Sequence, residues 1–153
     1  MQIHRAEPDN CPPERWDAMV ASDPNGHLLQ TWAWAKLKTL AGWQAERWYV
    51  EDNGQLLCGA QLLFQRRGPL QFAYLPKGPF VARENSAAMT MLWDKLHQRS
   101  RQRLAISLKF EPEWEEPNPS ATMWLNTHGF KPSEITIQPR RTIIVDLRAE
   151  EKD

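Results

Sequence analysis

The sequence predicts a mixed α/β fold, in which a mostly antiparallel sheet carries helices on both faces. Three observations support this fold class. Alternating apolar residues mark strands at residues 43–51, 56–65, 72–75 and 104–110. Helical spacing of apolar residues marks the segments between and around these strands. An Asn-Gly pair at residues 53–54 supplies the positive φ angles that a tight hairpin needs.

Composition limits the class of protein. At 153 residues the chain has the length of one ordinary domain. Basic and acidic residues balance at 19 each, which argues against a strong non-specific grip on nucleic acid. The sequence contains no apolar run that could cross a bilayer and no hydrophobic signal region, so we expect a cytoplasmic protein. Cys11 and Cys58 are expected to be free thiols, and no metal-ligand spacing is present.

The first third of the chain predicts one short strand and two helices. The strand covers residues 2–5, and the first helix begins at the proline pair of residues 12–13 and buries Trp16, Met19 and Val20. A second, amphipathic helix covers residues 30–41 and ends at Gly42. Helical spacing predicts that its apolar face consists of a set of four residues, Trp34, Leu37, Leu40 and Ala41.

Lys38 follows Trp34 by four residues, so the two side chains are neighbours on the surface of this helix. A cation held beside an indole can present its charge to an anionic ligand. The alternative is a surface lysine whose stem packs over a core tryptophan. Spacing alone leaves both interpretations open.

Three antiparallel strands follow the second helix. In the strand at residues 56–65, Gln61 and Gln65 lie on one face, and the other face carries Leu56, Cys58, Ala60, Leu62 and Phe64. Gly68 and Pro69 break this strand pattern, and the third strand ends in the segment PKGP at residues 76–79. The order up to this point is one strand, two helices and three strands.

A long helix, capped by Asn85 or Ser86, runs to about residue 103. Its three C-terminal arginines, at positions 99, 101 and 103, complement the helix dipole and are expected to lie on a solvated face. The strand at residues 104–110 is expected to be half buried, with an apolar side that consists of Leu104, Ile106, Leu108 and Phe110.

The last part of the chain predicts a helix that begins at Pro119 and closes at Gly129, and then a strand at residues 142–146. The complete order matches the GNAT acyltransferase fold, a mixed sheet with helices on both faces. We expect residues 1–147 to form one GNAT-like subdomain. Residues 148–153 then read as the start of a connection to a second subdomain that this chain lacks.

A GNAT order suggests transfer of an acyl group to an amine. Acyl-coenzyme-A-dependent members hold the pyrophosphate on glycine-rich backbone amides before the long helix. Residues 78–85 contain no run of closely spaced glycines, and Pro79 removes one N–H donor. Coenzyme A is therefore the less favoured donor.

Five segments together resemble the Fem-type (FemABX) aminoacyltransferases of peptidoglycan bridge formation. The segments are LQTWAW at residues 29–34 with Lys38 and the Gly-Trp pair at 42–43, YLPKGPF at 74–80, LKFEP at 108–112, Gly-Phe at 129–130 with IQPRRT at 137–142, and VDL at 145–147. Each segment is a weak signal alone. Their order and spacing make the resemblance specific, and it extends over nearly the whole chain.

The resemblance implies a transferase that moves an amino acid from aminoacyl-tRNA to the stem-peptide amine of a UDP-linked or lipid-linked muropeptide. It implies no cofactor, since aminoacyl-tRNA is the donor substrate, and it leaves a peripheral contact with the membrane surface open. Such enzymes consist of two GNAT-like subdomains, and this sequence matches the first. A non-catalytic module that binds the precursor is therefore an alternative function, and an acyl-coenzyme-A N-acyltransferase is a third.

The resemblance also suggests substrate-binding residues. Lys38, beside Trp34, matches the lysine that helps to hold the phosphates of the precursor, and Lys36 is the competing position. Tyr74 matches a strand end beside the groove, with an ordinary strand aromatic as the alternative. Lys77 is either a phosphate ligand or a solvated turn lysine.

Three residues near the end of the chain are weaker candidates. Arg140 and Arg141 contact either an anionic substrate or nearby glutamates, and Asp146 ends a strand where a second subdomain would begin. No catalytic residue is assigned, because the spacings support no Ser–His–Asp or Cys–His arrangement. An aminoacyl ester is already activated, so we expect positioning of the amine to supply most of the catalysis.

Overall fold

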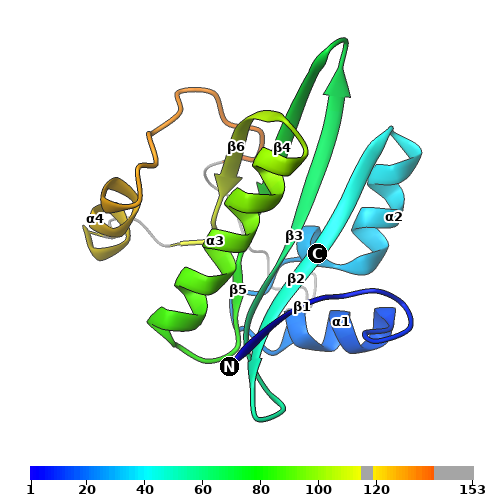
Figure 1. The fold of residues 1–153 in the computed structure, drawn as a ribbon, viewed down its shortest axis with the longest axis vertical. Coiled ribbons are helices and arrows are strands. Elements are labelled where there is room, and N and C mark those ends of the chain that lie inside the picture. Colours follow the sequence, from blue (N-terminus) through cyan, green and yellow to red (C-terminus); the bar gives the residue numbers. More distant parts are fainter. Residues whose placement is uncertain (115–118, 140–153) are drawn as a thin grey trace, which may run out of the picture. The chain divides into compact units, whose positions relative to one another are not determined.

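The computed structural model describes residues 1–114 and 119–139 of the protein. The chain divides into two compact units, Met1–Glu116 and Pro117–Asp153. Figure 1 shows the elements of the first unit around one sheet. In chain order these are β1 (Gln2–Arg5), α1 (Pro13–Ala21), the 3-10 helix η1 (Leu28–Gln30), α2 (Trp32–Leu40), β2 (Trp43–Asp52), β3 (Gln55–Arg67), β4 (Leu70–Pro76), β5 (Phe80–Val81), α3 (Ser86–Gln102) and β6 (Ala105–Glu111).

The sheet has the strand order β1-β2-β3-β4-β6, and β5 pairs with β3. All pairs are antiparallel except β4 with β6, which run parallel and are joined through α3. Helices cover both faces of the sheet. Neighbouring residues of a strand point to opposite faces, so two successive residues of β2 show which helix covers each face. Glu46 of β2 binds Arg99 of α3, whereas the next residue, Arg47, stacks on Trp32 of α2. The predicted mixed sheet with helices on both faces is confirmed.

Local turn and capping chemistry sets the ends of these elements. Asn53 and Gly54 have φ angles of 48° and 77° and close the β2–β3 hairpin. The Thr31 hydroxyl accepts a hydrogen bond from the Trp34 N–H, so α2 begins at Trp32, and the chain leaves α2 through Gly42 at φ 79°. The Asn85 side chain caps α3 by accepting from the N–H of Ala88 at 2.9 Å. The predicted caps at Gly42 and Asn85 are therefore confirmed.

The face of the sheet beneath α1 holds an aromatic core. Trp16, Met19 and Val20 are buried there, as helical spacing predicted, and the Trp16 ring meets the Phe80 ring edge-on at 5.4 Å. Arg47 lies in the same layer, with its guanidinium 3.6 Å from the centre of the Trp32 ring. Burial lowers the pKa of Arg47 to about 10, although the carboxylates of Asp17 and Glu7 act in the opposite direction. The indole face compensates part of the lost hydration of this cation.

Two predicted apolar faces are only partly buried. Leu37 and Leu40 were expected to belong to the packed face of α2, but they are 55% and 85% exposed, and Ala35 is the residue of α2 that is buried. On β6 the expected apolar side is exposed at Leu104 and Ile106, whereas Leu108 and Phe110 are half-buried as predicted. Periodicity identifies the residues that share a face, but it does not determine whether another element covers that face.

The C-terminal arginines of α3 are only partly solvated. Arg99 and Arg103 both bind the carboxylate of Glu46, with N–O distances of 2.8 Å, and Glu46 is 2% exposed. Burial by itself raises the pKa of Glu46. The hydrogen bonds and charges of the two arginines outweigh that effect and bring the pKa to about 2. Arg101 is exposed, as predicted for the whole cluster.

The second unit contains α4 (Pro119–Thr127), which begins at the predicted proline, and Gly129 follows it at φ 76°. The Trp124 ring stacks on the ring of His128 at 4.0 Å between centroids. The strand predicted at residues 142–146, with Arg140, Arg141 and Asp146, lies outside the described residues. The single subdomain predicted for residues 1–147 and the connection at 148–153 stay predictions.

We expect Glu46→Gln to lower the free energy of unfolding by about 3 kcal/mol at neutral pH, because the folded state loses a strongly bound carboxylate. The pKa of Glu46 falls from 4.5 to about 2 on folding, so this stabilisation is present above pH 4.5 and is lost as the pH falls toward 2. Urea unfolding at a series of pH values measures the effect. Glu84→Gln, at an exposed carboxylate, is the control. A stability difference between wild type and Glu46→Gln that does not shrink in acid would contradict this assignment.

Candidate functional site

Lys38 is held between two indoles. Its Nζ lies 4.9 Å from the centre of the Trp34 ring and 5.8 Å from that of the Trp43 ring. The arrangement follows from the chain, because α2 places Lys38 one turn after Trp34 and Gly42 then turns the backbone so that β2 starts with Trp43. Lys38 forms no hydrogen bond or ion pair with any described residue. Lys36, the competing lysine, is exposed and contacts no ring in the described part of the chain.

The indole N–H of Trp34 adds a second unfilled group. Its Nε1 is buried and has no hydrogen-bond partner among the described residues. Buried donors are normally paired, so this one calls for an explanation. A cation and an N–H donor on successive turns of α2 form a group that suits an oxyanion such as a phosphate.

Tyr74 continues this group along the same face of the sheet. Its ring lies 6.2 Å from the Trp43 ring, and its hydroxyl donates a hydrogen bond of 2.7 Å to Oε2 of Glu111. The parallel pairing of β4 with β6 brings Glu111 opposite Pro76, close to the end of β4. We call this group the Lys38–Tyr74 strip and define it as Trp34, Lys38, Trp43, Tyr74 and Glu111. Tyr74 is only 4% exposed, so it lies at the bottom of the strip.

Lys77 is not a solvated turn lysine. Its side chain is 15% exposed and its Nζ lies 2.5 Å from Oε2 of Glu113. The backbone has a φ angle of 46° at Lys77, where the chain leaves β4. The pKa of His27 is lowered, mainly by burial. The charge of Glu113 raises this pKa and that of Lys77 lowers it, so His27 lies within electrostatic range of the ion pair. The structure therefore places Lys77 in a second, internally paired cluster.

A buried glutamine connects the segments that carry these residues. Gln30 is fully buried, its side-chain oxygen accepts from the N–H of Gln61 at 2.7 Å, and its side-chain nitrogen donates to the carbonyl of Pro76 at 2.5 Å. Its own carbonyl accepts from the Trp16 indole N–H at 2.7 Å. Gln30 thus fixes η1 against α1, β3 and the end of β4.

Gln61 reciprocates, because its side-chain nitrogen donates to the carbonyls of Leu29 and Thr31, at 3.1 Å each. Sequence reasoning placed Gln30 in a motif and Gln61 on a strand face, but gave neither residue a structural role. The available signal was a polar amide within a strongly apolar strand, since burying such a group is costly unless hydrogen bonds replace those to water. The Gln61 side-chain nitrogen has two such bonds, whereas its side-chain oxygen has no partner among the described residues.

Gly78 leaves room for this glutamine. A Cβ atom at position 78 would lie 2.7 Å from Cδ of Gln30, which is closer than real side chains approach. The glycine is therefore required by a close approach between two segments that are 48 positions apart in sequence. The QTW and PKGP segments are parts of one interlocked structure.

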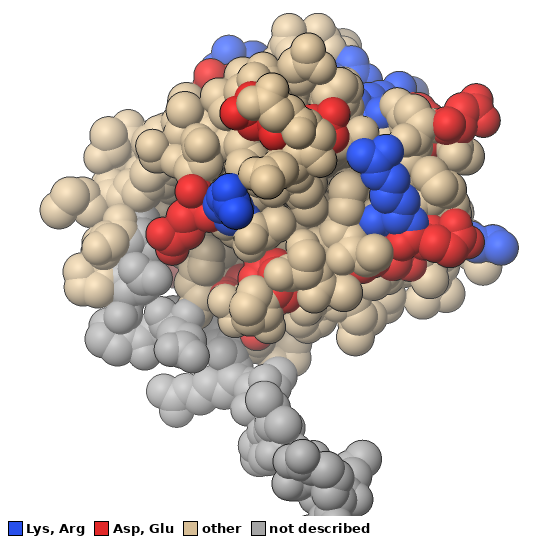
Figure 2. All heavy atoms as spheres, turned by 90° about the horizontal axis from the view of Figure 1, so that it is seen from below, with Lys and Arg blue, Asp and Glu red and all other residues tan. Residues whose placement is uncertain are grey.

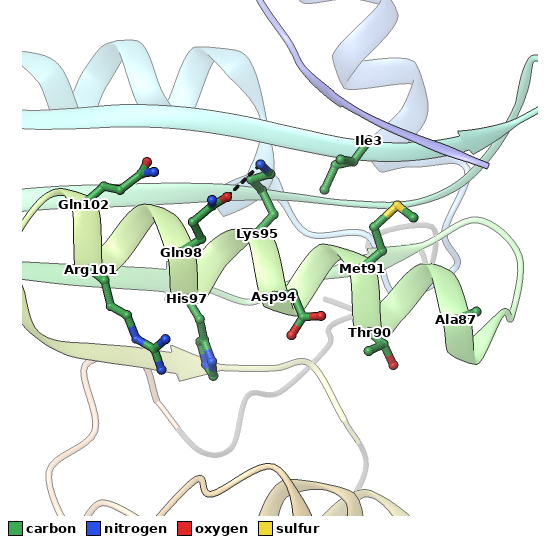
Figure 3. A pocket seen from close by; sticks show the side chains of 10 residues that line it. All are labelled: Ile3, Ala87, Thr90, Met91, Asp94, Lys95, His97, Gln98, Arg101 and Gln102. Carbon is green, nitrogen blue, oxygen red and sulfur yellow. Dashed lines mark hydrogen bonds between the residues drawn. The ribbon is translucent and has the colours of Figure 1, made fainter.

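Other surface regions are weaker candidates. Figure 2 looks onto the lower end of the view in Figure 1 and shows acidic and basic side chains interspersed there. An open groove runs along the outer side of α3 (Figure 3), where Lys95 donates to Gln98 and charges of both signs alternate. None of the predicted site residues lines this groove. Among the described residues, no group of three or more His, Cys, Asp or Glu side chains is placed to hold a metal ion.

The two cysteines are also poor candidates for chemistry. Both are free and buried, and burial raises the pKa of Cys11 and brings that of Cys58 to about 12. A thiol in such surroundings is unreactive at neutral pH. No helix among the described residues combines the length and hydrophobicity that a bilayer crossing requires.

Comparison with known proteins identifies the family. The model of the FemAB family matches residues 12–125, which include α1 to α3, the whole sheet of the first unit after β1, and the Lys38–Tyr74 strip. The chain belongs to the FemAB family. The resemblance that the five sequence segments indicated is confirmed.

FemAB relatives with curated names are larger proteins. Lipid II:glycine glycyltransferase of Staphylococcus aureus strain MRSA252 is 35% identical over 141 residues, which are 86% of this chain and 34% of the relative. The enzyme of the same name from the bovine strain RF122 / ET3-1 matches to the same extent. The chain thus spans about a third of the length of the curated relatives that it matches.

Solved structures agree with the family and the fold. The crystal structure of FemX matches with a TM-score of 0.75 and 32% identity, over 86% of this chain and 32% of that one. An aminoglycoside 6'-N-acetyltransferase from Acinetobacter haemolyticus matches with a TM-score of 0.60 at 14% identity, over 94% of this chain and its own full length. The second match shows the fold alone, and it confirms the predicted GNAT-like architecture of this FemAB chain.

The Gln30–Gly78 contact predicts coupled effects on stability. Gln30→Ala leaves the N–H of Gln61 and the carbonyl of Pro76 unpaired in the interior, so we expect a loss of about 2–4 kcal/mol. Gly78→Ala should also destabilise, through its clash with the same side chain. In the double variant the clash is gone, and the total loss should be smaller than the sum. Urea unfolding of the four proteins in this cycle measures the coupling, and strictly additive losses would refute it.

Proposed function

We propose that this FemAB chain takes part in peptidoglycan bridge formation, as an aminoacyltransferase that moves an amino acid from aminoacyl-tRNA to the stem-peptide amine of a muropeptide precursor. The family match and the glycyltransferase activity named for the curated relatives support this assignment. Aminoacyl-tRNA and UDP-linked precursors are cytoplasmic, so the proposal places the protein in the cytoplasm.

The observation that carries the proposal is the Lys38 ammonium. Two indole faces hold it in position, and no described carboxylate neutralises it. A preorganised cation loses little side-chain entropy on binding, and a charge-assisted hydrogen bond to phosphate is stronger than a neutral one. We assign Lys38 to the diphosphate of the precursor.

The rest of the Lys38–Tyr74 strip suits the uncharged part of the precursor. Trp43 supplies flat apolar surface, and the buried Tyr74 supports it from below, with its hydroxyl fixed by Glu111. Lys77 also belongs to the proposed substrate-binding set, but its ammonium already pairs with Glu113. A phosphate could bind Lys77 only by displacing that carboxylate, so Lys38 is the stronger assignment.

The proposed reaction needs little from the protein besides positioning. The stem-peptide amine attacks the ester carbonyl of aminoacyl-tRNA, an amide bond forms, and the 3'-terminal hydroxyl of the tRNA leaves. Holding the amine against an activated ester can supply much of the rate enhancement. We propose that the amine gives its proton to substrate oxygens or to water, and no cysteine nucleophile is needed.

Two alternatives make different demands on the same fold. A non-catalytic module would bind the precursor through Lys38 without transferring anything. An acyl-coenzyme-A transferase would need free backbone N–H groups ahead of α3. Pro79 offers none there, and the Asn85 side chain already occupies the N–H of Ala88. These observations favour a muropeptide over coenzyme A.

Calorimetric titration of the chain with a UDP-muropeptide tests the assignment. We expect Lys38→Ala to weaken binding roughly 10- to 100-fold, because a charge-assisted hydrogen bond to phosphate is lost. Thermal stability should change little, because Lys38 has no polar partner within the described part of the fold.

Lys36→Ala is the matched control, since it removes a lysine two positions away on the exposed side of the same helix. Equal affinities of wild type and Lys38→Ala would remove Lys38 from the site. Binding of acetyl-coenzyme A in place of the muropeptide would overturn the proposed function. Transfer of an amino acid from aminoacyl-tRNA, assayed with the same protein, separates the enzyme from the binding module.

A further inference from the structure

Three connections of the first unit meet at one end of the sheet. Trp43, the first residue of β2, pairs with Gln65, and β3 turns into β4 directly beyond that pair, where Arg67 lies opposite Leu70. The parallel pair Gln71 and Ala105 brings the start of β6 to the same level. The α2–β2, β3–β4 and α3–β6 connections therefore lie together, at the upper end of the view in Figure 1. We call this surface the loop end and define it as residues 36–42, 66–70 and 101–106.

Each of the three connections exposes a large aliphatic side chain. Leu40 and Leu104 are 85% and 82% exposed, Leu70 is 43% exposed, and Ile106 follows Leu104 on the same strand end. Leu104 also has a φ angle of 54°, a left-handed conformation that a leucine adopts only at a cost. Burial within the described fold does not compensate that cost. Exposed apolar side chains that gather from three separate segments indicate a contact surface.

The charge of the loop end has a single sign. Residues 36–45, 62–76 and 95–110 contain no Asp or Glu, although the whole chain has as many acidic as basic residues. The nearest carboxylate on β2 is Glu46, which is buried and already bound by Arg99 and Arg103. Arg66 and Arg67 donate only to the neutral oxygens of Gly68 and Gln65 among the described residues. Lys36 and Arg101 are exposed as well.

We propose that the loop end docks onto a bilayer surface that carries anionic lipid headgroups. The aliphatic tips insert at the boundary of the acyl chains, and the surrounding lysines and arginines bind headgroup phosphates. Basic residues near an anionic surface each strengthen attachment about fivefold. An inserted leucine adds a similar or larger factor, about tenfold when its side chain is fully buried. Together they give a reversible, salt-sensitive attachment.

The side chains at the loop end favour a lipid surface over a nucleic acid. Single-stranded RNA is gripped by aromatic side chains on which bases stack, and duplex RNA by polar contacts to its backbone. The exposed apolar side chains of the loop end are leucine and isoleucine, which contribute to binding of neither single-stranded nor duplex RNA. A bilayer rewards both of the features found together, aliphatic insertion and uncompensated positive charge.

Docking at this end would also orient the Lys38–Tyr74 strip. Lys38 lies on α2 only two positions before Leu40, so its ammonium would lie just beneath the headgroup layer. If the proposed function is correct, this position suits a precursor whose diphosphate is attached to a lipid. That consequence rests on the proposed function, whereas docking itself rests on the loop end alone.

Vesicle flotation without any muropeptide tests docking independently of the proposed function. The 153-residue chain is mixed with vesicles of phosphatidylcholine alone, or with added phosphatidylglycerol. We expect binding to the anionic vesicles, decreasing with added salt. Arg67→Glu should weaken it at least tenfold, since it reverses a charge at the surface. Leu40→Ser combined with Leu104→Asn should weaken it at least as much, and asparagine tolerates the left-handed backbone at position 104.

Matched controls lie away from the loop end. Arg83→Glu reverses the charge of another exposed arginine, which donates to Gln55 beside the β2–β3 hairpin, and Leu28→Ser removes another exposed leucine. Both controls should bind vesicles like wild type, and circular dichroism confirms that each variant is folded. Failure to bind anionic vesicles, or equal losses in the controls, would overturn the inference. A third outcome would also overturn it: the chain binds total tRNA, Arg67→Glu abolishes that binding, and the Leu40→Ser, Leu104→Asn variant still binds vesicles like wild type.

Discussion

The hydrogen bonds of one buried amide, the Gln30 side chain, determine where α2 lies. Gln30 donates to the end of β4 and accepts from the middle of β3, and its carbonyl receives the Trp16 indole N–H. An amide in an apolar interior is tolerated only when these partners are in place, so the contact is highly selective in geometry. It fixes η1, and therefore the start of α2, relative to the sheet. Gly78 is part of the same constraint, because the amide occupies the space of a side chain there.

This constraint explains why α2 can expose so much apolar surface. The helix fully buries only Ala35, and Trp32 packs half-buried against the core beneath α1, so burial alone does little to hold the rest of the helix in place. Hydrogen bonds take over that role, through Gln30, through the Gln61 amide on the Leu29 and Thr31 carbonyls, and through Asp17, which accepts from the Trp32 N–H at 2.7 Å. The remaining faces of α2 are then available to present Lys38 between its indoles and Leu40 at the loop end.

The sequence was sufficient for the parts of the structure that depend on local chemistry. The Asn53-Gly54 hairpin, the Asn85 cap and the closing Gly42 are each encoded within a few residues, so the element order was predictable. The pairing of Glu46 with Arg99 and Arg103, and that of Gln30 with Gln61, joins positions more than 30 apart and leaves no periodic signal. Spacing put Lys38 beside Trp34, whereas the second indole, from Trp43, depends on the turn at Gly42. The exposure of Leu40 and Leu104 was mispredicted because a periodic pattern contains no information about the partner of a face.

The cations of this domain fall into two groups that local sequence does not distinguish. Arg99, Arg103 and Lys77 each have a carboxylate within ion-pair distance, and their charge is used within the fold. Lys38 and Arg67 contact only rings or a neutral oxygen among the described residues. An uncompensated cation adds nothing to folding that a neutral residue could not supply, and it repels its basic neighbours. Arg47 is buried without a carboxylate in ion-pair distance among the described residues, and the Trp32 ring takes the place of that partner. Lys38 and Arg67 are less buried, and we propose that they bind anions outside the chain, a phosphate at Lys38 and a charged lipid surface at Arg67.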